Sequence, residues 1–125
     1  MIANNPVSIS VSTQYLKEHS EPKANRYVFA YTVTISNNGT ENVQLLSRHW
    51  LITDAKNKIQ EVKGEGVIGE QPTIEPGSHF SYTSSAMLET EAGTMEGSYQ
   101  MISQSGENFD APIPAFMLTR PGALH

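Results

Sequence analysis

The sequence predicts an all-β protein, an antiparallel β-sandwich of the immunoglobulin or fibronectin type III kind with about seven strands. Apolar and polar residues alternate with a period of two along much of the chain, which is typical of strands that bury one face. Groups of turn-forming residues separate these segments, as expected for a sandwich. No segment has the apolar spacing of an amphipathic helix. A small closed barrel is the alternative, because strand number alone does not decide closure.

The first two predicted strands cover residues 7–16 and 26–36. Along VSISVSTQY the apolar residues fall on one face and the serines on the other. RYVFAYTVTIS repeats the pattern with more β-branched and aromatic residues, which favour strands. The residues predicted to face the core from these two segments are Val7, Ile9, Val11, Tyr15, Tyr27, Phe29, Tyr31, Val33 and Ile35.

Turn sequences delimit five further predicted strands, over residues 43–53, 58–63, 78–85, 95–103 and 108–118. NNGT and DAKNK contain residues that tolerate a positive φ, EPGS places Pro before Gly as tight turns do, and QSGEN precedes the last strand. That strand contains Pro112 and Pro114, which cannot donate to a ladder. It is therefore predicted to be an edge strand or a bulged one.

The third predicted strand contains a conflict of register. Strict alternation along LLSRHWLIT places Arg48 on the same face as Trp50. Either Trp50 faces the core and Arg48 lies at its mouth, with its aliphatic stem buried, or a bulge shifts the register. We favour Trp50 inside, because the single Trp of a small domain is usually a core anchor.

The composition limits the class of protein. The chain has 125 residues, the size of one domain, which we predict over residues 1–125. It contains no cysteine, and this excludes disulfide scaffolds and cysteine-based zinc sites. No apolar run approaches the length of a membrane span, and the start, MIANNPVSIS, lacks the features of a secretory signal. The expected location is cytoplasmic, without a membrane partner.

The distribution of charge argues against nucleic acid as a partner. The net charge is −5, and residues 64–110 include eight acidic residues but no Lys or Arg. Binding of phosphates needs clustered positive charge, and the basic group that precedes this region is small. We expect no nucleic-acid partner.

The segment GEGVIGEQP, residues 64–72, contains the spacing G-x-G-x-x-G, formed by Gly64, Gly66 and Gly69. In a dinucleotide-binding loop a helix opens at the third glycine and directs its N–H groups at the pyrophosphate. Pro72 and Pro76 prevent such a helix, and Glu65 and Glu70 would repel phosphate. We expect an ordered loop whose glycines adopt a positive φ or allow another part of the backbone to approach closely. A conspicuous loop on a rigid sandwich is also a candidate binding surface.

The remaining residues offer no recognised catalytic or metal-binding pattern. The four histidines lack the i, i+4 spacing of a helical metal site, although strands could bring His49 and His79 together. The acidic residues form no calcium-type loop, and no serine lies in a nucleophile elbow. We predict no catalytic residue, no metal ligand and no cofactor.

Five segments together resemble the ApaG family: RHWLITDA, VKGEGVIGEQPTIEPG, FSYTS, GTMEGSYQM and FDAPIPAFML. The resemblance runs from about Val7 to the end of the chain, with the motifs in the same order. The chain departs from the family at Ser84-Ser85, where the family often has Ser-Gly.

The resemblance implies a fibronectin type III-like sandwich in a bacterial cytoplasmic protein with no established enzymatic activity. It also implies a loose link with cobalt resistance and magnesium efflux. The family takes its name from gene neighbourhood with a diadenosine tetraphosphate hydrolase. Similar domains are appended to F-box and other partner-binding proteins in eukaryotes, which indicates protein–protein interaction.

We therefore predict a non-catalytic binding module for another, unidentified protein. The predicted interaction loop and its neighbours are Gly64, Glu65, Gly66, Gly69, Glu70, Arg48 and His49. The alternative is a small-ligand-binding protein, for a nucleotide such as a dinucleoside polyphosphate or for a divalent cation. An exposed sheet edge could also recruit a partner strand or a second copy of the chain, giving a homodimer.

Overall fold

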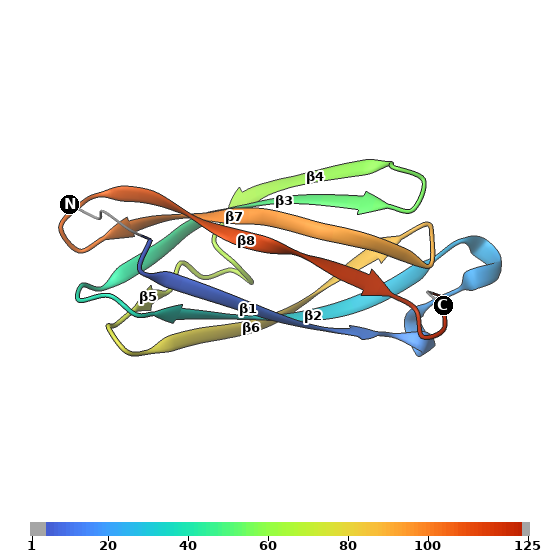
Figure 1. Cartoon of the computed structure of the whole chain (residues 1–125), viewed down its shortest axis with the longest axis horizontal. Coiled ribbons are helices and arrows are strands. Elements are labelled where there is room, and N and C mark those ends of the chain that lie inside the picture. Colours follow the sequence, from blue (N-terminus) through green and yellow to red (C-terminus); the bar gives the residue numbers. More distant parts are fainter. Residues whose placement is uncertain (1–4, 124–125) are drawn as a thin grey trace.

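Two antiparallel sheets pack face to face around one hydrophobic core (Figure 1). The computed structural model describes residues 5–123. One sheet has the order β1-β2-β6, formed by β1 (Val7–Tyr15), β2 (Tyr27–Asn37) and β6 (His79–Leu88). The other has the order β4-β3-β7-β8, with β5 also paired to β3, and is formed by β3 (Val43–Asp54), β4 (Ile59–Glu65), β5 (Thr73–Ile74), β7 (Ala92–Ser103) and β8 (Asn108–Thr119). The predicted antiparallel sandwich is confirmed.

All seven predicted strands are present, and the structure adds an eighth, β5, which has only two residues. Three predicted boundaries were wrong by several residues: β6 continues to Leu88, β7 begins at Ala92, and β4 continues to Glu65. The hydroxyl-rich run SYTSSAM lies inside β6 and is not a turn. Within residues 5–123 the only helices are two three-residue 3₁₀ turns, Lys17–His19 and Pro22–Ala24, and neither has the length or apolarity that crossing a membrane requires.

The period-two pattern identified the core faces of β1 and β2. In β2 the odd-numbered residues are buried and the even-numbered ones are half-buried along the whole strand. In β1 only Val7 is fully buried, while Ile9, Val11 and Tyr15 pack against the core from its margin. The predicted faces of both strands are therefore confirmed.

The predicted turns close through their own polar groups. The Asp54 carboxylate accepts hydrogen bonds from the backbone N–H groups of Lys56 and Lys58. In EPGS, Gly77 has φ +80° and the N–H of Ser78 donates to the carbonyl of Glu75, as in a turn that needs glycine at its third position.

Aromatic side chains join the two sheets at the centre of the core. Trp50 is 2% exposed and meets the rings of Tyr31, Tyr99 and Phe116 edge to face, at centroid distances of 5.5, 6.2 and 5.9 Å. The hydroxyl of Tyr82 on β6 is hydrogen-bonded to that of Tyr99 on β7. Trp50 therefore faces the core, as predicted.

Asn37 is a buried polar residue that fastens three segments at one end of the sandwich. Its side-chain amide donates to the carbonyls of Glu41 at 2.7 Å and Ile74 at 2.9 Å. Its side-chain oxygen accepts the N–H of Gly39 at 2.9 Å. Asn37 is 0% exposed, and its bond to Ile74 lies in the buried interior.

We expect Asn37→Ala to lower the free energy of unfolding by about 2 to 3 kcal/mol, because the buried carbonyl of Ile74 and the partly buried carbonyl of Glu41 lose their donor. Asn38→Ala is the matched control, since within residues 5–123 the exposed Asn38 side chain bonds only to the Ser8 hydroxyl. Asn38→Ala should change the free energy of unfolding by no more than about 0.5 kcal/mol. Urea unfolding measures both, and equal effects would contradict the role given to Asn37.

The buried phenols predict a loss of stability at alkaline pH. Burial raises the pKa of Tyr82 to about 12, and the Tyr99 hydrogen bond opposes this shift only in part. Burial also raises the pKa of Tyr99 far above its ordinary value. Unfolded phenols ionise near pH 10, so above that pH the unfolded chain releases protons that the folded chain retains. The stability is fully present below about pH 10 and falls as pH rises towards 12.

The expected decline is up to about 1.4 kcal/mol per pH unit for each proton retained. Urea unfolding between about pH 9 and about pH 11 measures it. Tyr82→Phe removes one of these phenols. The free energy of unfolding of this variant should therefore fall less steeply with pH than that of the wild type. An identical slope in the two proteins would show that Tyr82 does not contribute.

Candidate functional site

A β-bulge in β3 determines where the site forms. The register between β3 and β7 shifts between Leu45 and Ser47, so that Leu46 is the extra residue. Because of this extra residue, Leu45 and Trp50 both face the core, with exposed fractions of 0% and 2%. The two explanations offered for LLSRHWLIT are therefore both correct: Trp50 is inside, and a bulge is present.

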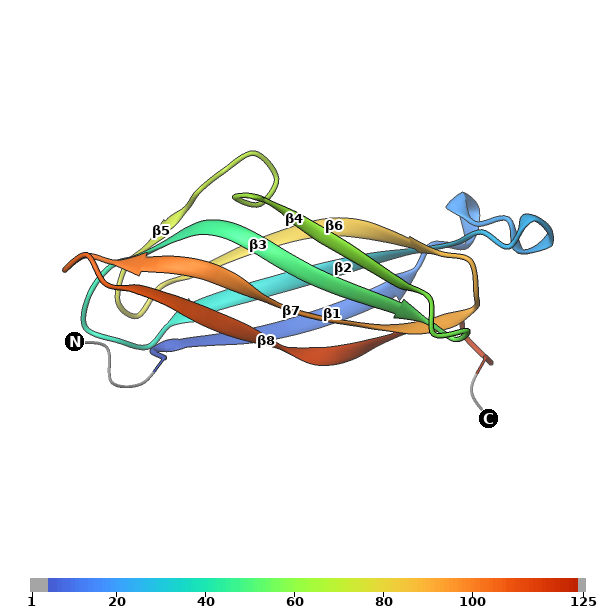
Figure 2. The same cartoon turned by 90° about the horizontal axis from the view of Figure 1, so that it is seen from above.

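The glycine loop, residues 64–72, begins in the last two residues of β4 and leads to β5, and both strands pair with the same side of β3 (Figure 2). The carbonyl of Leu46 accepts the N–H of Gly66 at 2.8 Å and the side-chain amide of Gln71 at 2.9 Å. The N–H of Leu45 donates to the carbonyl of Pro72 at 3.0 Å. The loop is therefore bound along its length to the bulge.

The tip of the glycine loop is a two-residue hairpin turn. Val67 and Glu70 exchange backbone hydrogen bonds of 2.8 and 2.9 Å. Between them Ile68 has φ +43° and Gly69 has φ +79°, as in the turns that suit hairpins. Val67 is buried in the core at 1% exposure, whereas Ile68 is 55% exposed. No helix follows Gly69, as the prolines predicted.

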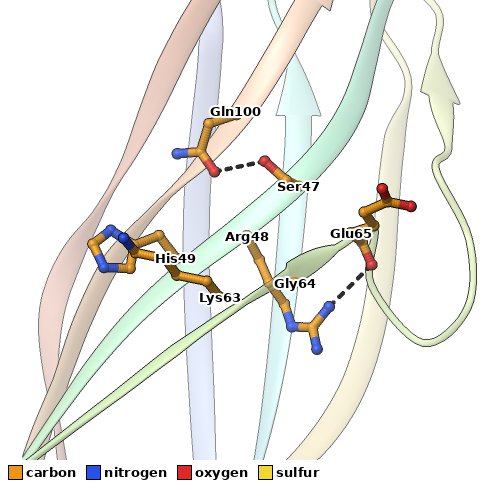
Figure 3. Close-up of a pocket in the computed structure, with 7 residues that line it drawn as sticks. All are labelled: Ser47, Arg48, His49, Lys63, Gly64, Glu65 and Gln100. Carbon is orange, nitrogen blue, oxygen red and sulfur yellow. Dashed lines mark hydrogen bonds between the residues drawn. The ribbon is translucent and has the colours of Figure 1, made fainter.

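Arg48 holds the loop from below, as Figure 3 shows. Its Nη1 donates to the carbonyls of Glu65 at 3.1 Å and Gly66 at 2.8 Å. The guanidinium lies against Gly64 so closely that a Cβ there would be 2.9 Å from it. Arg48 therefore lies beside the loop, as expected, and Gly64 leaves room for its guanidinium.

His49 lies on the opposite face of β3, because side chains alternate along a strand (Figure 3). Its Nε2 is 2.7 Å from the Glu61 carboxylate, which is also 3.8 Å from Lys63 Nζ. The hydrogen bond to His49, together with the charge of Lys63, lowers the pKa of Glu61. His49 therefore belongs to a charged group on the outer face of the sheet. It also lines a second cavity, of about 470 Å³, together with Gly64 and Glu65 at the start of the loop (Figure 3).

A cavity of about 330 Å³ lies beneath the glycine loop, where the two sheets open. Tyr31, Tyr82 and Ser84 line it from one sheet, and Arg48 lines it from the other. Within residues 5–123 Arg48 forms no ion pair. In the same part of the chain, no three His, Asp or Glu side chains are grouped to hold a metal ion. The cavity is thus lined by an arginine and by three residues with hydroxyl groups.

Sequence reasoning identified the loop but missed the residues that shape it. Val67 and Ile68, which form its turn, and Gln71, which anchors it, lie within the predicted loop but were not singled out. Leu46, the second anchor, was not predicted to belong to the site. The one local signal was Gly69 as the second residue of a two-residue turn, a common hairpin position. The bulge that anchors the loop has no such signal.

These features define a class of protein: a small antiparallel β-sandwich with one rigid loop tied by backbone hydrogen bonds across the opening between its sheets. The model of the ApaG domain matches residues 17–103. The chain is 59% identical over 119 residues to Protein ApaG of Thiobacillus denitrificans and to Protein ApaG of Azotobacter vinelandii, which covers 95% of this chain and 94% of each relative.

A solved structure agrees with this assignment. The putative ApaA protein from Bordetella pertussis is 46% identical, with a TM-score of 0.90 over 93% of this chain and 94% of that one. The chain belongs to the ApaG family.

The glycines of the loop predict a graded response to alanine. At Gly69 a Cβ would meet nothing within 4 Å, so Gly69→Ala costs only the strain of φ +79°, about 1 kcal/mol. At Gly66, with φ +61°, a Cβ would lie 2.2 Å from the carbonyl oxygen of Glu70. The turn must then move, and the expected loss is at least about twice as large.

Urea unfolding of the two variants measures this difference, and amide spectra report which loop residues move. The two variants share the same substitution and a positive φ, so they differ mainly in steric contact. Equal losses would show that the loop adapts freely and is not rigid.

Proposed function

We propose that the chain is a non-catalytic binding module whose glycine loop engages another protein. The observation that carries this proposal is Ile68, an apolar side chain held at the tip of the loop with 55% of its surface exposed. The turn is closed on both sides by Val67 and Glu70. A rigid loop loses little entropy on binding, which favours its use as an interaction surface.

The conformation of Ile68 is costly for folding. A left-handed backbone costs an L-residue roughly 1 to 2 kcal/mol, and a β-branched residue at φ +43° is an outlier. Glycine or asparagine would fit this turn position better. Ile68 neither suits the backbone of the turn nor buries its side chain. We therefore infer that Ile68 makes a contact outside the chain.

The cavity beneath the loop supplies the polar half of the proposed surface. Ile68 and Gly69 line it together with Arg48 and Tyr82. An apolar anchor beside a few oriented polar groups is the arrangement that concentrates binding energy in protein interfaces. The proposed partner would place an apolar pocket over Ile68 and an acceptor group near the guanidinium.

Ile68→Asn tests the proposal without unfolding the turn. Asparagine tolerates the left-handed region, so we expect the free energy of unfolding to rise by about 1 kcal/mol. Capture of proteins from a lysate with the immobilised chain should at the same time lose the partner that the wild type retains. Gly66→Asp, which distorts the loop, should lose it as well.

Met117→Asn is the matched control for this capture. Met117 is also apolar and 51% exposed, but it lies in β8 and belongs neither to the loop nor to β4. It should retain the partner as the wild type does. A partner that is still retained by Ile68→Asn, or that is lost with Met117→Asn, would refute the role proposed for the loop.

The competing ligand classes are a nucleotide, such as a dinucleoside polyphosphate, and a divalent cation. Titration of labelled protein with nucleotides, Mg²⁺ and Co²⁺, followed by backbone amide shifts, separates them from a protein partner. Saturable shifts confined to Gly64, Gly66 and Gly69 would replace our proposal with a small-ligand site.

A further inference from the structure

β4 is an open edge of the larger sheet. It pairs with β3 on one side only, and among residues 5–123 no strand pairs with its other side. Six of its seven residues are exposed, and the remaining one, Gly64, is half-buried. In Figure 2, β4 lies beside β3, at this edge of the larger sheet. Open edges of this kind are templates for pairing with another strand.

Hydrogen bonds at the two ends of the β3–β4 ladder show which backbone groups of β4 are open. The N–H of Asp54 donates to the carbonyl of Lys58, and the N–H of Gly66 donates to the carbonyl of Leu46. Hydrogen-bonded pairs alternate along an antiparallel ladder. The even-numbered residues between these points therefore bond to β3.

The odd-numbered residues direct their N–H and C=O groups outward. The carbonyl of Glu65 is already bonded to Arg48. The residues with both groups open are Ile59, Glu61 and Lys63.

The charges on this edge complement those of a second β4 when the two-fold axis passes through Val62. Antiparallel pairing must place open residues opposite open residues. A two-fold axis at Glu61 or at Lys63 would bring like charges directly opposite each other, which is destabilising. An axis at Val62 instead places Glu61 opposite Lys63 of the second copy, and Lys63 opposite its Glu61.

The side chains at the edge are arranged for this register. Glu61 and Lys63 project from the same face of β4, with 3.8 Å between the carboxylate and Nζ. His49 holds the Glu61 carboxylate from the neighbouring strand at 2.7 Å. On the other face Val62 is 36% exposed and would meet Val62 of the second copy as a close non-hydrogen-bonded pair.

We propose that the chain forms a two-fold symmetric dimer by antiparallel pairing of β4 with β4 of a second copy, centred on Val62. The dimer joins the two five-stranded sheets into one continuous sheet. Because the pairing is antiparallel, the two glycine loops lie at opposite ends of the joined edge. The dimer is therefore a bivalent module, which raises the avidity for a partner with two sites. This inference does not depend on the ligand of the loop.

Charge exchange at the edge tests the register. The paired segment is short, so the dimer belongs to the weak, transient class, and sedimentation from about 10 µM to about 1 mM covers the expected range. The wild-type average mass should rise with concentration towards twice that of one chain. Glu61→Lys and Lys63→Glu each turn two attractive pairs into repulsive ones and should weaken association at least about tenfold.

Combinations of the two substitutions restore the pairing. The double variant E61K/K63E carries the same complementary pattern reversed and should associate like the wild type. An equimolar mixture of the two single variants pairs a basic edge with an acidic edge and should associate more strongly than either alone. Dimerisation of the single variants at wild-type strength, or no association in the mixture, would overturn the proposal.

Amide hydrogen exchange of the wild-type protein supplies a second measurement that does not depend on variants. The amides of Glu61 and Lys63 should become protected as the concentration rises, whereas Val62, bonded to β3, should be protected throughout. A wild-type chain that stays monomeric to about 1 mM, with Glu61 and Lys63 unprotected, would also overturn the proposal.

Discussion

The bulge at Leu46 is the constraint on which both the core and the candidate site depend. Without the extra residue, Leu45 and Trp50 would point to opposite faces of β3, and one of these large apolar side chains would lie in water. With it, both are buried. The same irregularity frees the Leu46 carbonyl from the β7 ladder to accept two hydrogen bonds from the glycine loop. It also leaves Arg48 at the opening between the sheets, where its guanidinium supports the loop. Packing in the core thus positions a surface loop.

The three glycines of the loop show how one spacing can serve a purpose unrelated to phosphate binding. Gly64 makes room for a guanidinium, Gly66 makes room for a backbone carbonyl, and Gly69 takes the left-handed position of a tight turn. In a dinucleotide-binding loop the same spacing is useful because a helix follows it. Here the chain returns to β3 through Pro72 and begins a short strand. The context after the third glycine, and not the spacing, decides which use applies.

Most of the fold was predictable from local patterns, and most of the details of the site were not. Alternation along β2 and turn chemistry such as that of EPGS depend on neighbouring residues, so they are readable in the sequence. β5 exists only because Thr73 and Ile74 meet β3, about thirty positions earlier in the chain. The bulge at Leu46 reflects competition between two core residues, and Ile68 adopts a conformation that its side chain disfavours. Features of these kinds become visible only when the whole sandwich is assembled.

The surroundings of Trp50 give the molecule its own spectroscopic reporter. It is the single tryptophan of the chain, and its indole N–H has no hydrogen-bond partner in the described residues. Tyr31 and Tyr99 lie against it as energy donors, and Arg48 is two positions away on the same face of β3. The fluorescence of Trp50 is therefore that of an indole shielded from water, near the candidate site. A ligand that alters the opening between the sheets would change the emission wavelength or the quantum yield of Trp50, and no added label is needed to measure this.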